Sequence, residues 1–285
     1  MRKAETIAAL LQEARKNLFD ADIELSALDA RLLLQAASGL SHEDLIAEPN
    51  LILSADKVTK FQTFIERRLN HEPVTRILGE REFYGRPFQV SPAVLDPRAD
   101  TETIIELILE LLGEEPKRFV DLGTGSGAIA TTLLAERPNW SGISVDLSAE
   151  ALKIAESNAV ALGVQQRLAF HNASWLDGII EKFDLIVSNP PYIPHREVFE
   201  LSLEVQNYDP HLALDGGRDG LEAYKAIATQ AADHLNSNGL VILEIGAGQS
   251  ADVTQIFEAQ GFKLSRHKSD LGGHIRALAF TLAYL

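Results

Sequence analysis

From residue 101 onward, short apolar segments alternate with amphipathic helical segments, and this alternation is the strongest constraint on the fold. The apolar segments have the length of buried strands, and the segments between them carry apolar residues at helical spacing. We expect strands at 119–122, 142–146, 167–171, 183–188, 240–245, 262–267 and 275–282. Helices are expected at 101–112, 128–136, 150–162, 220–235 and 251–260. Such alternation predicts an α/β fold, a mainly parallel sheet with helices on both faces.

The N-terminal part of the chain has a different character. Its apolar residues recur at helical spacing, and Ser41-His42-Glu43-Asp44 has the pattern of a capping box. Helices are expected at 4–17, 23–38, after Ser41, and from Ser54 to about Leu69. Aromatic residues then flank Gly85-Arg86-Pro87, which indicates a hairpin. The sequence thus predicts three parts, which are a small helical domain at 1–73, a β-hairpin connector at 74–95 and the α/β domain at 96–285.

A glycine-rich loop, Gly123-Thr124-Gly125-Ser126-Gly127, joins the first strand of the α/β domain to its first helix. Glycines allow the backbone to turn sharply and to approach a ligand closely. Asp146 ends the next strand, where an acidic side chain accepts hydrogen bonds from ribose hydroxyls. These features predict an adenosine-containing cofactor without deciding which one, because Gly123-x-Gly125-x-x-Ala128 also fits the dinucleotide fingerprint. Asp121 favours S-adenosylmethionine, since its carboxylate would repel a pyrophosphate and suits the ammonium group of a methionine.

The segment Asn189-Pro190-Pro191-Tyr192 follows the strand at 183–188. Neither proline has an N–H for a β-ladder, so the segment is expected to form a rigid turn at the carboxyl end of that strand, the edge where α/β sheets bind ligands. The Asn189 side-chain oxygen and the Pro190 carbonyl can accept two hydrogen bonds from one NH2 group, and the Tyr192 ring can pack on its plane. This turn favours S-adenosylmethionine further, because hydride transfer has no need of it.

Composition limits the possible functions. The chain of 285 residues has a net charge of −15 and no cysteine, and its histidines are scattered, so we expect no metal site. Residues 1–88 are nearly neutral, whereas residues 89–285 carry 14 basic and 27 acidic residues. An enzyme of DNA or RNA needs a basic face, so we expect no direct nucleic-acid partner. No apolar run is long enough to span a membrane, and the N-terminus does not resemble a signal peptide, so we expect a soluble, cytoplasmic protein.

Several further blocks accompany the glycine loop and the Asn-Pro-Pro-Tyr turn over nearly the whole chain. They are Glu72-Pro73-Val74, Ile77-Leu78-Gly79, Phe83-Tyr84-Gly85, Pro97-Arg98, Asp100-Thr101-Glu102, Asp209 to Leu214, Gly216-Gly217 and Asp219-Gly220-Leu221. Together they resemble the peptide chain release factor glutamine N5-methyltransferases. The resemblance implies a class I methyltransferase domain, Rossmann-like with a mainly parallel seven-stranded sheet, behind a helical domain and a hairpin.

The resemblance also implies an activity and residue roles. The substrate would be the glutamine of the Gly-Gly-Gln loop in class 1 peptide chain release factors, and the cofactor would be S-adenosylmethionine. Cofactor binding would fall to the glycine loop, Asp146, Trp175 and Asn189, with Trp175 packed near the adenine. The substrate amide would be held by Asn189, Pro190, Pro191 and Tyr192, of which Asn189, Pro190 and Tyr192 would serve the methyl transfer. No metal is implied. The helical domain and the hairpin would grip the rest of the release factor.

The chain departs from the family pattern at three positions. Asp96 stands where an aliphatic residue is usual, Ala99 where a proline is usual, and Ser174 where an aspartate often precedes the tryptophan. For Arg98 and Glu102, a place near the cofactor or substrate and a simple ion pair at a helix start are equally open. The alternative functions are glutamine methylation of a ribosomal protein, N6-adenine methylation of nucleic acid, and cofactor binding without catalysis.

Overall fold

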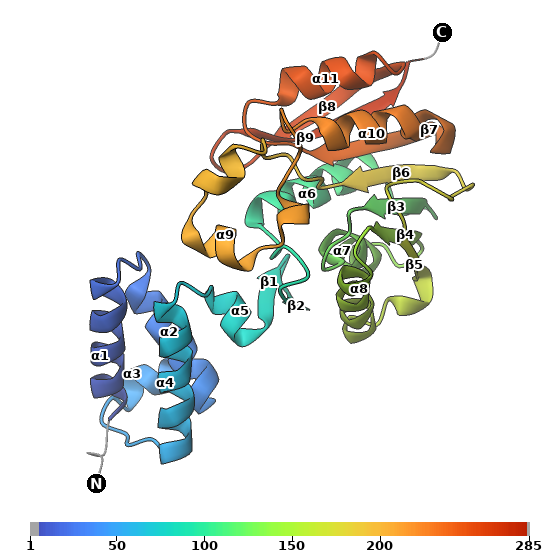
Figure 1. Cartoon of the computed structure of the whole chain (residues 1–285). Helices are drawn as coiled ribbons and strands as arrows, with labels where there is room; N and C mark the ends of the chain where they lie inside the picture. Colours follow the sequence, from blue (N-terminus) through green and yellow to red (C-terminus); the bar gives the residue numbers. More distant parts are fainter. Residues whose placement is uncertain (1–5, 284–285) are drawn as a thin grey trace. The chain divides into compact units, whose positions relative to one another are not determined.

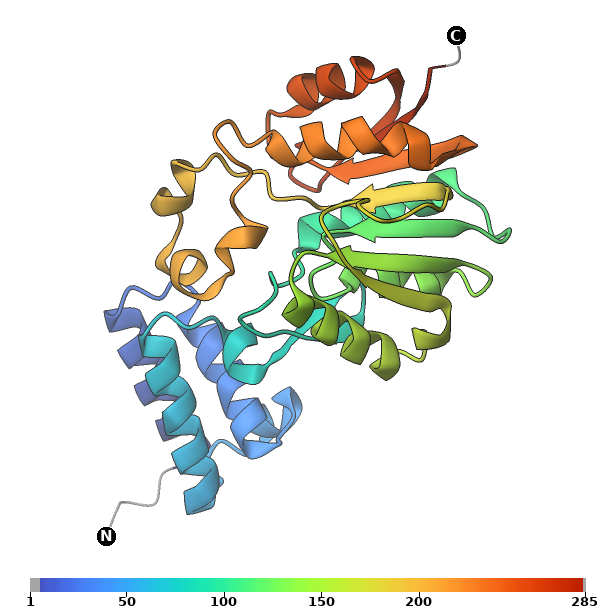
Figure 2. The same cartoon turned by 45° about the vertical axis from the view of Figure 1, so that its right-hand side comes forward.

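The computed structural model describes residues 6–283, and the chain divides into two compact units (Figures 1 and 2). The first unit is helical and extends to Gly79, and it also includes Ser202–Tyr208. The second unit comprises Glu80–Leu201 and the chain from Asp209 onward. None of the helices in the described part of the chain is long and apolar enough to cross a membrane.

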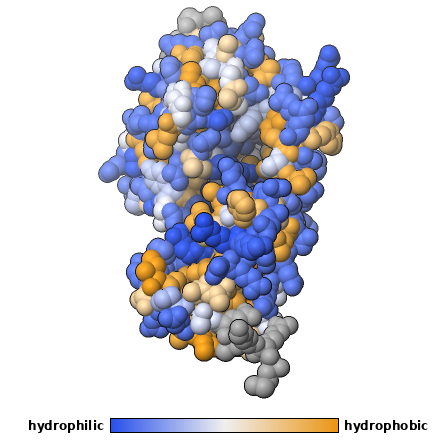
Figure 3. Space-filling model, turned by 90° about the vertical axis from the view of Figure 1, so that its left-hand side faces the viewer, coloured by the Kyte–Doolittle hydropathy of each residue, from blue (hydrophilic) through white to orange (hydrophobic). Residues whose placement is uncertain are grey.

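The helical unit has one apolar core. The helices that form it are α1 (Ile7–Asp20), α2 (Ser26–Ser38), α3 (His42–Ala47), α4 (Ala55–Leu69) and α5 (Val74–Leu78). The unit also includes α9 (Leu203–Tyr208), which has no buried residue. The predicted capping box at the start of α3 is confirmed, because the Asp44 N–H donates to Ser41 Oγ (3.1 Å) and the Ser41 N–H donates to Asp44 Oδ2 (2.9 Å). Hydrophobic residues reach the surface of this unit, the lower part of Figure 3, in patches separated by hydrophilic ones.

Helix α9 belongs to the helical unit although it lies far along the chain. Arg68, which is 5% exposed, donates from Nε to Asp29 Oδ2 (2.7 Å) and from Nη2 to Glu204 Oε1 (2.5 Å). The Tyr208 hydroxyl donates to the Asn70 carbonyl (2.9 Å). A buried guanidinium needs anionic partners, so Asp29 and Glu204 together make the burial of Arg68 tolerable.

The second unit contains the predicted seven-stranded, mainly parallel sheet, with strand order β5-β4-β3-β6-β7-β9-β8. The strands are β3 (Arg118–Leu122), β4 (Ser141–Asp146), β5 (Leu168–Asn172), β6 (Phe183–Ser188), β7 (Leu235–Glu244), β8 (Phe262–Ser269) and β9 (Ile275–Leu282). Strands β3 to β7 pair in parallel, and β9 runs antiparallel to both of its neighbours. Strand order reverses between β3 and β6, which opens a crevice at their carboxyl ends.

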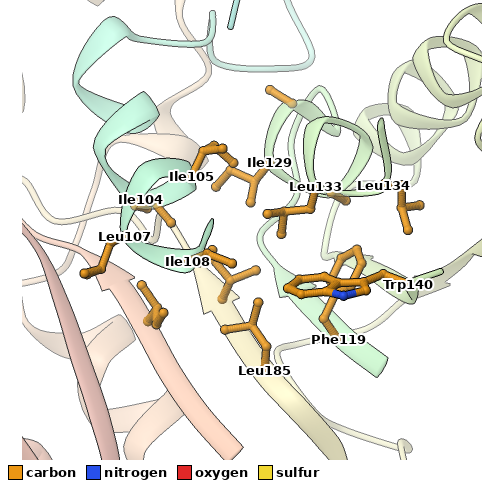
Figure 4. Close-up of a cluster of buried hydrophobic side chains, with 14 of the residues drawn as sticks. Ile104, Ile105, Leu107, Ile108, Phe119, Ile129, Leu133, Leu134, Trp140 and Leu185 are labelled. Carbon is orange, nitrogen blue, oxygen red and sulfur yellow. The ribbon is translucent and has the colours of Figure 1, made fainter. Parts of the chain in front are cut away.

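Helices cover both faces of this sheet. Helices α6 (Glu102–Leu111), α7 (Ala128–Glu136) and α8 (Ala149–Ala161) pack on one face, and α10 (Glu222–Ala231) and α11 (Ser250–Glu258) pack on the other. Figure 4 shows the first face, where isoleucines and leucines of α6 and α7 meet Phe119, Trp140 and Leu185. The central strands β3 and β6 are therefore buried on two sides, which explains their largely apolar sequences, whereas the edge strand β5 is only partly buried.

The hairpin forms from β1 (Glu80–Phe83) and β2 (Arg86–Gln89), with Tyr84 and Gly85 in the left-handed region at its turn. It groups with the second unit, because Phe83 and Phe88 are fully buried in the same core cluster as residues of α6 and α7. The sequence placed the hairpin segment from residue 74, where the structure has α5. Pro73 precedes that helix, where its missing N–H costs nothing, and Gly79 ends it at φ +76°.

Most other elements shift by one to three residues from their expected bounds, and the largest differences are at β7 and α10. Strand β7 begins at Leu235, five residues before the expected start, and α10 correspondingly ends at Ala231. The polar run Asn236-Ser237-Asn238 hid the first part of the strand from a reading based on hydrophobicity. A register irregularity between Phe183 and Leu185 in the pairing with β7 accommodates this polar stretch.

Candidate active site

A cavity of about 420 Å³ lies in the second unit at the carboxyl ends of β3, β4 and β6. The glycine loop, the end of β4 and the turn after β6 contribute to its wall, and so do residues 92–98 and 210–213. The sequence predicted the first three of these segments. This is the crevice in which doubly wound sheets bind ligands.

Hydrogen bonds to β4 and to Asp121 hold the glycine loop in place. The Gly123 and Thr124 N–H groups both donate to the Val145 carbonyl (2.9 and 3.0 Å). The Thr124 hydroxyl donates to Asp121 Oδ2 (2.6 Å), and Asp121 is fully buried and does not line the cavity. Burial raises the pKa of Asp121 to about 7. Asp121 therefore shapes the loop through Thr124, whereas the sequence had suggested electrostatic selection of the cofactor.

Four of the five loop residues, Gly123 to Ser126, line the cavity, and Gly127 does not. Gly127 instead precedes α7 at φ +77°, where a Cβ atom would lie 3.0 Å from the Ala155 side chain. Its role is the close packing of α7 against α8, which only glycine permits. The Ser126 carbonyl accepts a hydrogen bond from Asn158 Nδ2 (2.8 Å), and the same side chain bonds to the Gln89 backbone of the hairpin.

Asp146 lies at the end of β4 on the cavity wall. Its Oδ2 accepts from the Gly125 N–H (2.9 Å) and its Oδ1 accepts from the Ser148 N–H (2.8 Å). Each carboxylate oxygen can accept more than one hydrogen bond, so both retain capacity for hydroxyl groups of a ligand. Burial raises the pKa of Asp146, and the backbone donors oppose that rise. Leu147 follows it as an exposed apolar residue of the wall, a position that the sequence analysis missed.

Trp175 lies beside the glycine loop and lines the cavity, as does Ser174. Its φ is +52°, which is rare for an aromatic residue, and a Cβ on Gly123 would lie 3.9 Å from the indole ring. A strained backbone of this kind persists where surrounding structure holds it, often at ligand sites. The indole thus forms a flat apolar wall next to the loop.

Some residues of the turn after β6 line the cavity, and others pack toward the core. Asn189 and Pro191 line the cavity, Pro190 is buried, and Tyr192 lies outside the lining. Asn189 Nδ2 donates to Thr101 Oγ1 (3.1 Å), and no backbone N–H of the described residues donates to the Pro190 carbonyl. The Tyr192 carbonyl accepts from Gln249 Nε2 (3.0 Å), and burial raises the pKa of the Tyr192 hydroxyl to about 12.

The two residues whose roles the sequence left open are separated in the structure. Arg98 lines the cavity and forms an ion pair with Asp209 Oδ2 (2.7 Å). Glu102 accepts from the Tyr84 N–H (2.9 Å) and holds the hairpin turn, away from the cavity. Among the family departures, Asp96 is 7% exposed and lines the cavity, while Ala99 starts a short 3-10 turn before α6.

Further lining residues come from the loop before α6 and from a single short 3-10 turn at His211–Ala213. Leu95, Pro97, Leu212 and Ala213 complete the apolar wall. The Pro-Arg and Asp-Pro-His blocks pointed to these segments only through the family resemblance, because a loop or a three-residue turn is too short to show a periodic pattern. Thr101, from the block Asp100-Thr101-Glu102, also lines the cavity.

Comparison with known proteins identifies the family to which the two units are similar. Residues 9–79 match the protein family described as "PrmC N-terminal domain", and residues 98–205 match the family described as "Methyltransferase small domain". A release factor glutamine methyltransferase of Bradyrhizobium diazoefficiens is 46% identical over 96% of this chain and 92% of its own length. One of Agrobacterium fabrum is 43% identical over 96% of this chain and 97% of its own length.

A solved structure supports the fold alone. The ribosomal protein L11 methylase of Lactobacillus delbrueckii subsp. bulgaricus aligns with a TM-score of 0.51 at 24% identity, over 72% of this chain and 89% of its own. The predicted class I methyltransferase fold is confirmed, and the predicted cofactor, S-adenosylmethionine, agrees with the family. With nearly full-length relatives at more than 40% identity, this chain belongs to the release factor glutamine methyltransferase family.

Proposed function

We propose that this protein transfers a methyl group from S-adenosylmethionine to the side-chain amide nitrogen (N5) of the glutamine in the Gly-Gly-Gln loop of class 1 peptide chain release factors, in the cytoplasm. One observation carries the proposal: Asn189 lies on the wall of the same cavity as the glycine loop and Asp146. An acceptor for an NH2 group thus shares one cavity with residues that suit an adenosine. The names of the similar proteins support the choice of substrate.

The chemistry of the cavity fits S-adenosylmethionine. Asp146 offers both carboxylate oxygens to ribose hydroxyls, and Leu147 with Trp175 offers apolar surface to an adenine ring. The exposed Gly123 at φ +69° lets a ligand approach the backbone where a side chain would obstruct it. The cavity volume of about 420 Å³ falls within the range of small-molecule sites.

Replacing Asp146 by alanine is expected to weaken S-adenosylmethionine binding by about 1.5–3 kcal/mol, the scale for hydrogen bonds to a charged group. The loss arises because the ribose hydroxyls would face an apolar methyl group. Isothermal titration calorimetry measures the change. Asp146→Asn serves as the comparison, since it keeps one acceptor and is expected to lose less. Unchanged affinity in both variants would remove Asp146 from the ribose site.

An amide nitrogen is a poor nucleophile because its lone pair is delocalised into the carbonyl group. S-adenosylmethionine supplies a methyl group on a sulfonium, a strong electrophile with a neutral leaving group. The protein's part is to orient the amide and to stabilise the positive charge that grows on its nitrogen. Asn189 on the cavity wall would accept a hydrogen bond from one N–H through Oδ1. The Pro190 carbonyl, to which no backbone N–H of the described residues donates, would accept the other once the amide has entered the turn, and the Tyr192 ring would then cover the amide plane. The nitrogen then releases one proton to water.

The direct test is incubation of the purified protein with labelled S-adenosylmethionine and a class 1 release factor, followed by mass-spectrometric mapping of the modified residue. The expected product carries one methyl group on the glutamine of the Gly-Gly-Gln loop. Ribosomal protein and duplex DNA serve as competing substrates. Transfer to either of these in preference to the release factor would contradict the proposed substrate.

The helical unit is proposed to bind the body of the release factor. It carries exposed apolar residues, among them Phe19 (71% exposed) and Ile52 (57%), and none of its residues that the structure describes lines the cavity. A chain that begins at Glu80 is expected to bind S-adenosylmethionine with wild-type affinity but to transfer methyl groups to intact release factor at least about tenfold more slowly. The cut preserves the hairpin, whose Phe83 and Phe88 belong to the core of the second unit. Wild-type rates from the folded, shortened chain would refute this role.

A further inference from the structure

A second buried acid lies beside the turn that carries Asn189. Glu244 ends β7 and is 1% exposed. Strands β6 and β7 are parallel, with Ser188 opposite Leu243, so the next residue of each strand, Asn189 and Glu244, extends from the same edge of the sheet. Nothing in the cofactor site described above uses this carboxylate. A carboxyl group at that depth is costly to keep ionised, and burial raises the pKa of Glu244 to about 7.

Three side chains form a contact network at this point. Asn189 Nδ2 donates to Thr101 Oγ1 (3.1 Å). Hydrogen-bonding contacts from the Thr101 hydroxyl and from the Asn189 amide oppose the rise in the pKa of Glu244. Thr101 is itself 4% exposed and comes from the segment that opens α6. The network therefore joins Glu244 on β7 to Asn189 after β6 through a residue from outside the sheet.

The chemistry of these groups gives the network a direction. An ionised carboxylate can only accept hydrogen bonds, so the Thr101 hydroxyl must donate its proton toward Glu244. The Thr101 oxygen is then left as an acceptor, and it requires an N–H from Asn189. A reversed Asn189 amide would bring Oδ1 against both the Thr101 oxygen and the carboxylate, where oxygen would face oxygen. Only one of the two amide orientations is compatible with an ionised Glu244.

We propose that Glu244 is a positioning residue, which acts with Thr101 to hold the Asn189 amide so that Oδ1 is presented to the NH2 group of the substrate. The inference rests on the proposed function, because it assumes that Asn189 Oδ1 receives the reacting nitrogen. It extends to any substrate that offers an NH2 group to this turn.

The other groups around Glu244 offer its carboxylate little stabilisation beyond the hydrogen bonds of this network. Arg276 is the nearby cation, and its guanidinium already pairs with Asp270 (2.8 Å) and Asp100 (3.2 Å). The other titratable groups that face Glu244 are the hydroxyls of Tyr192 and Tyr224, which stay neutral at ordinary pH. Glu244 Oε2 has no hydrogen-bond partner among the described residues. A carboxyl group that is buried with one oxygen unbonded lowers the stability of the fold, so we expect it to have a function.

The consequence for stability has a definite sign. The pKa of Glu244 rises from its usual 4.5 to about 7 on folding, so the folded chain holds this proton over a pH range in which the unfolded chain has lost it. The group's contribution to stability is most favourable below about pH 4.5 and declines as the pH rises to about 7. Glutamine has a similar shape and no charge to bury. If Glu244 served only to stabilise the fold, Glu244→Gln would destabilise the chain. If Glu244 is a positioning residue, the same substitution would not lower the stability.

The test measures Glu244→Gln in the full chain. A glutamine can donate as well as accept, so it no longer forces the Thr101 and Asn189 hydrogen bonds into one direction. We expect kcat to fall about 10- to 100-fold, somewhat less than for direct loss of an active-site polar group. The affinity for S-adenosylmethionine, measured by calorimetry, should remain within twofold of wild type. The melting temperature at pH 8 should be unchanged or higher.

The pH profile gives an independent measurement. Wild-type kcat is expected to fall as the pH drops through about 7, because a protonated Glu244 can donate and no longer selects one Asn189 orientation. Glu244→Gln should lose this dependence. Thr101→Ser, which keeps the hydroxyl, should retain most of kcat, whereas Thr101→Val should behave like Glu244→Gln. Asp184→Asn, at the opposite end of β6, is the matched control and should leave kcat unchanged.

The wild-type reaction separates failure of the proposed function from failure of this inference. If the wild type methylates another NH2-bearing substrate, the proposed function fails, and the ratio of variant to wild-type kcat is measured with that substrate. If Glu244→Gln has the kcat and the pH profile of the wild type, the positioning role is wrong. The same conclusion follows if Glu244→Gln lowers the melting temperature while each folded molecule turns over normally.

Discussion

Replacing Asn189 by alanine is expected to lower kcat by about 10²–10³, the scale for loss of one preorganised polar group from an active site. The affinity for S-adenosylmethionine should change little, because the side-chain oxygen serves the nitrogen that receives the methyl group. Interactions realised mainly in the transition state affect kcat more than binding. Single-turnover kinetics with a class 1 release factor measures the effect.

The alternative is that Asn189 only stabilises the turn through Thr101. In that case Asn189→Ala would lower the melting temperature and leave the rate of each folded molecule nearly normal. Both quantities are measured on one sample. Tyr192→Phe is the comparison variant, and it should be mild because the partly buried ring acts by packing, whereas Tyr192→Ala should be severe.

Replacing Phe88 by alanine is expected to lower the free energy of unfolding by about 3–5 kcal/mol, the usual cost of removing a fully buried phenylalanine. Phe88 packs edge to face on Phe83, with ring centroids 5.9 Å apart, and both belong to the core cluster that also contains residues of α6. The loss would be a large fraction of the stability of an ordinary domain. Urea unfolding followed by intrinsic fluorescence of Trp140, in the same core, measures it.

Phe199→Ala is the matched control, because Phe199 lies in the same unit and is 61% exposed. Its effect on stability should stay within about 0.5 kcal/mol. If Phe88→Ala were equally mild, the hairpin would be an independent connector, as the sequence suggested, and not a part of the core.

The alternation of strands and helices was visible in the sequence because buried parallel strands leave an unmistakable apolar signal. Strand β6 and helix α7 have the bounds that were expected. The Asn189 turn was placed correctly at the end of β6, since two prolines cannot continue a ladder. Its site roles stay predictions until the variants are measured.

Other features depend on contacts between distant residues and left no local signal. Hydrophobic patterning cannot distinguish a core acid such as Glu244 from a surface acid that ends a strand. For the same reason the sequence did not show that Asp121 and Gly127 face a neighbouring element and not the cavity wall. The part of Gly127 in cofactor binding stays a prediction. Helix α9 was missed because its six residues are too short for a periodic pattern.

Helix α9 limits how this family can exchange parts. The helical unit is encoded in two pieces, one at the start of the chain and one at Ser202–Tyr208 inside the catalytic sequence. In a chimera that received only residues 1–79 from a relative, the residue at position 68 would come from the relative, whereas its ion-pair partner Glu204 would come from this chain. Recombination between relatives is therefore constrained at two sites at once, and these two stretches are expected to be inherited together.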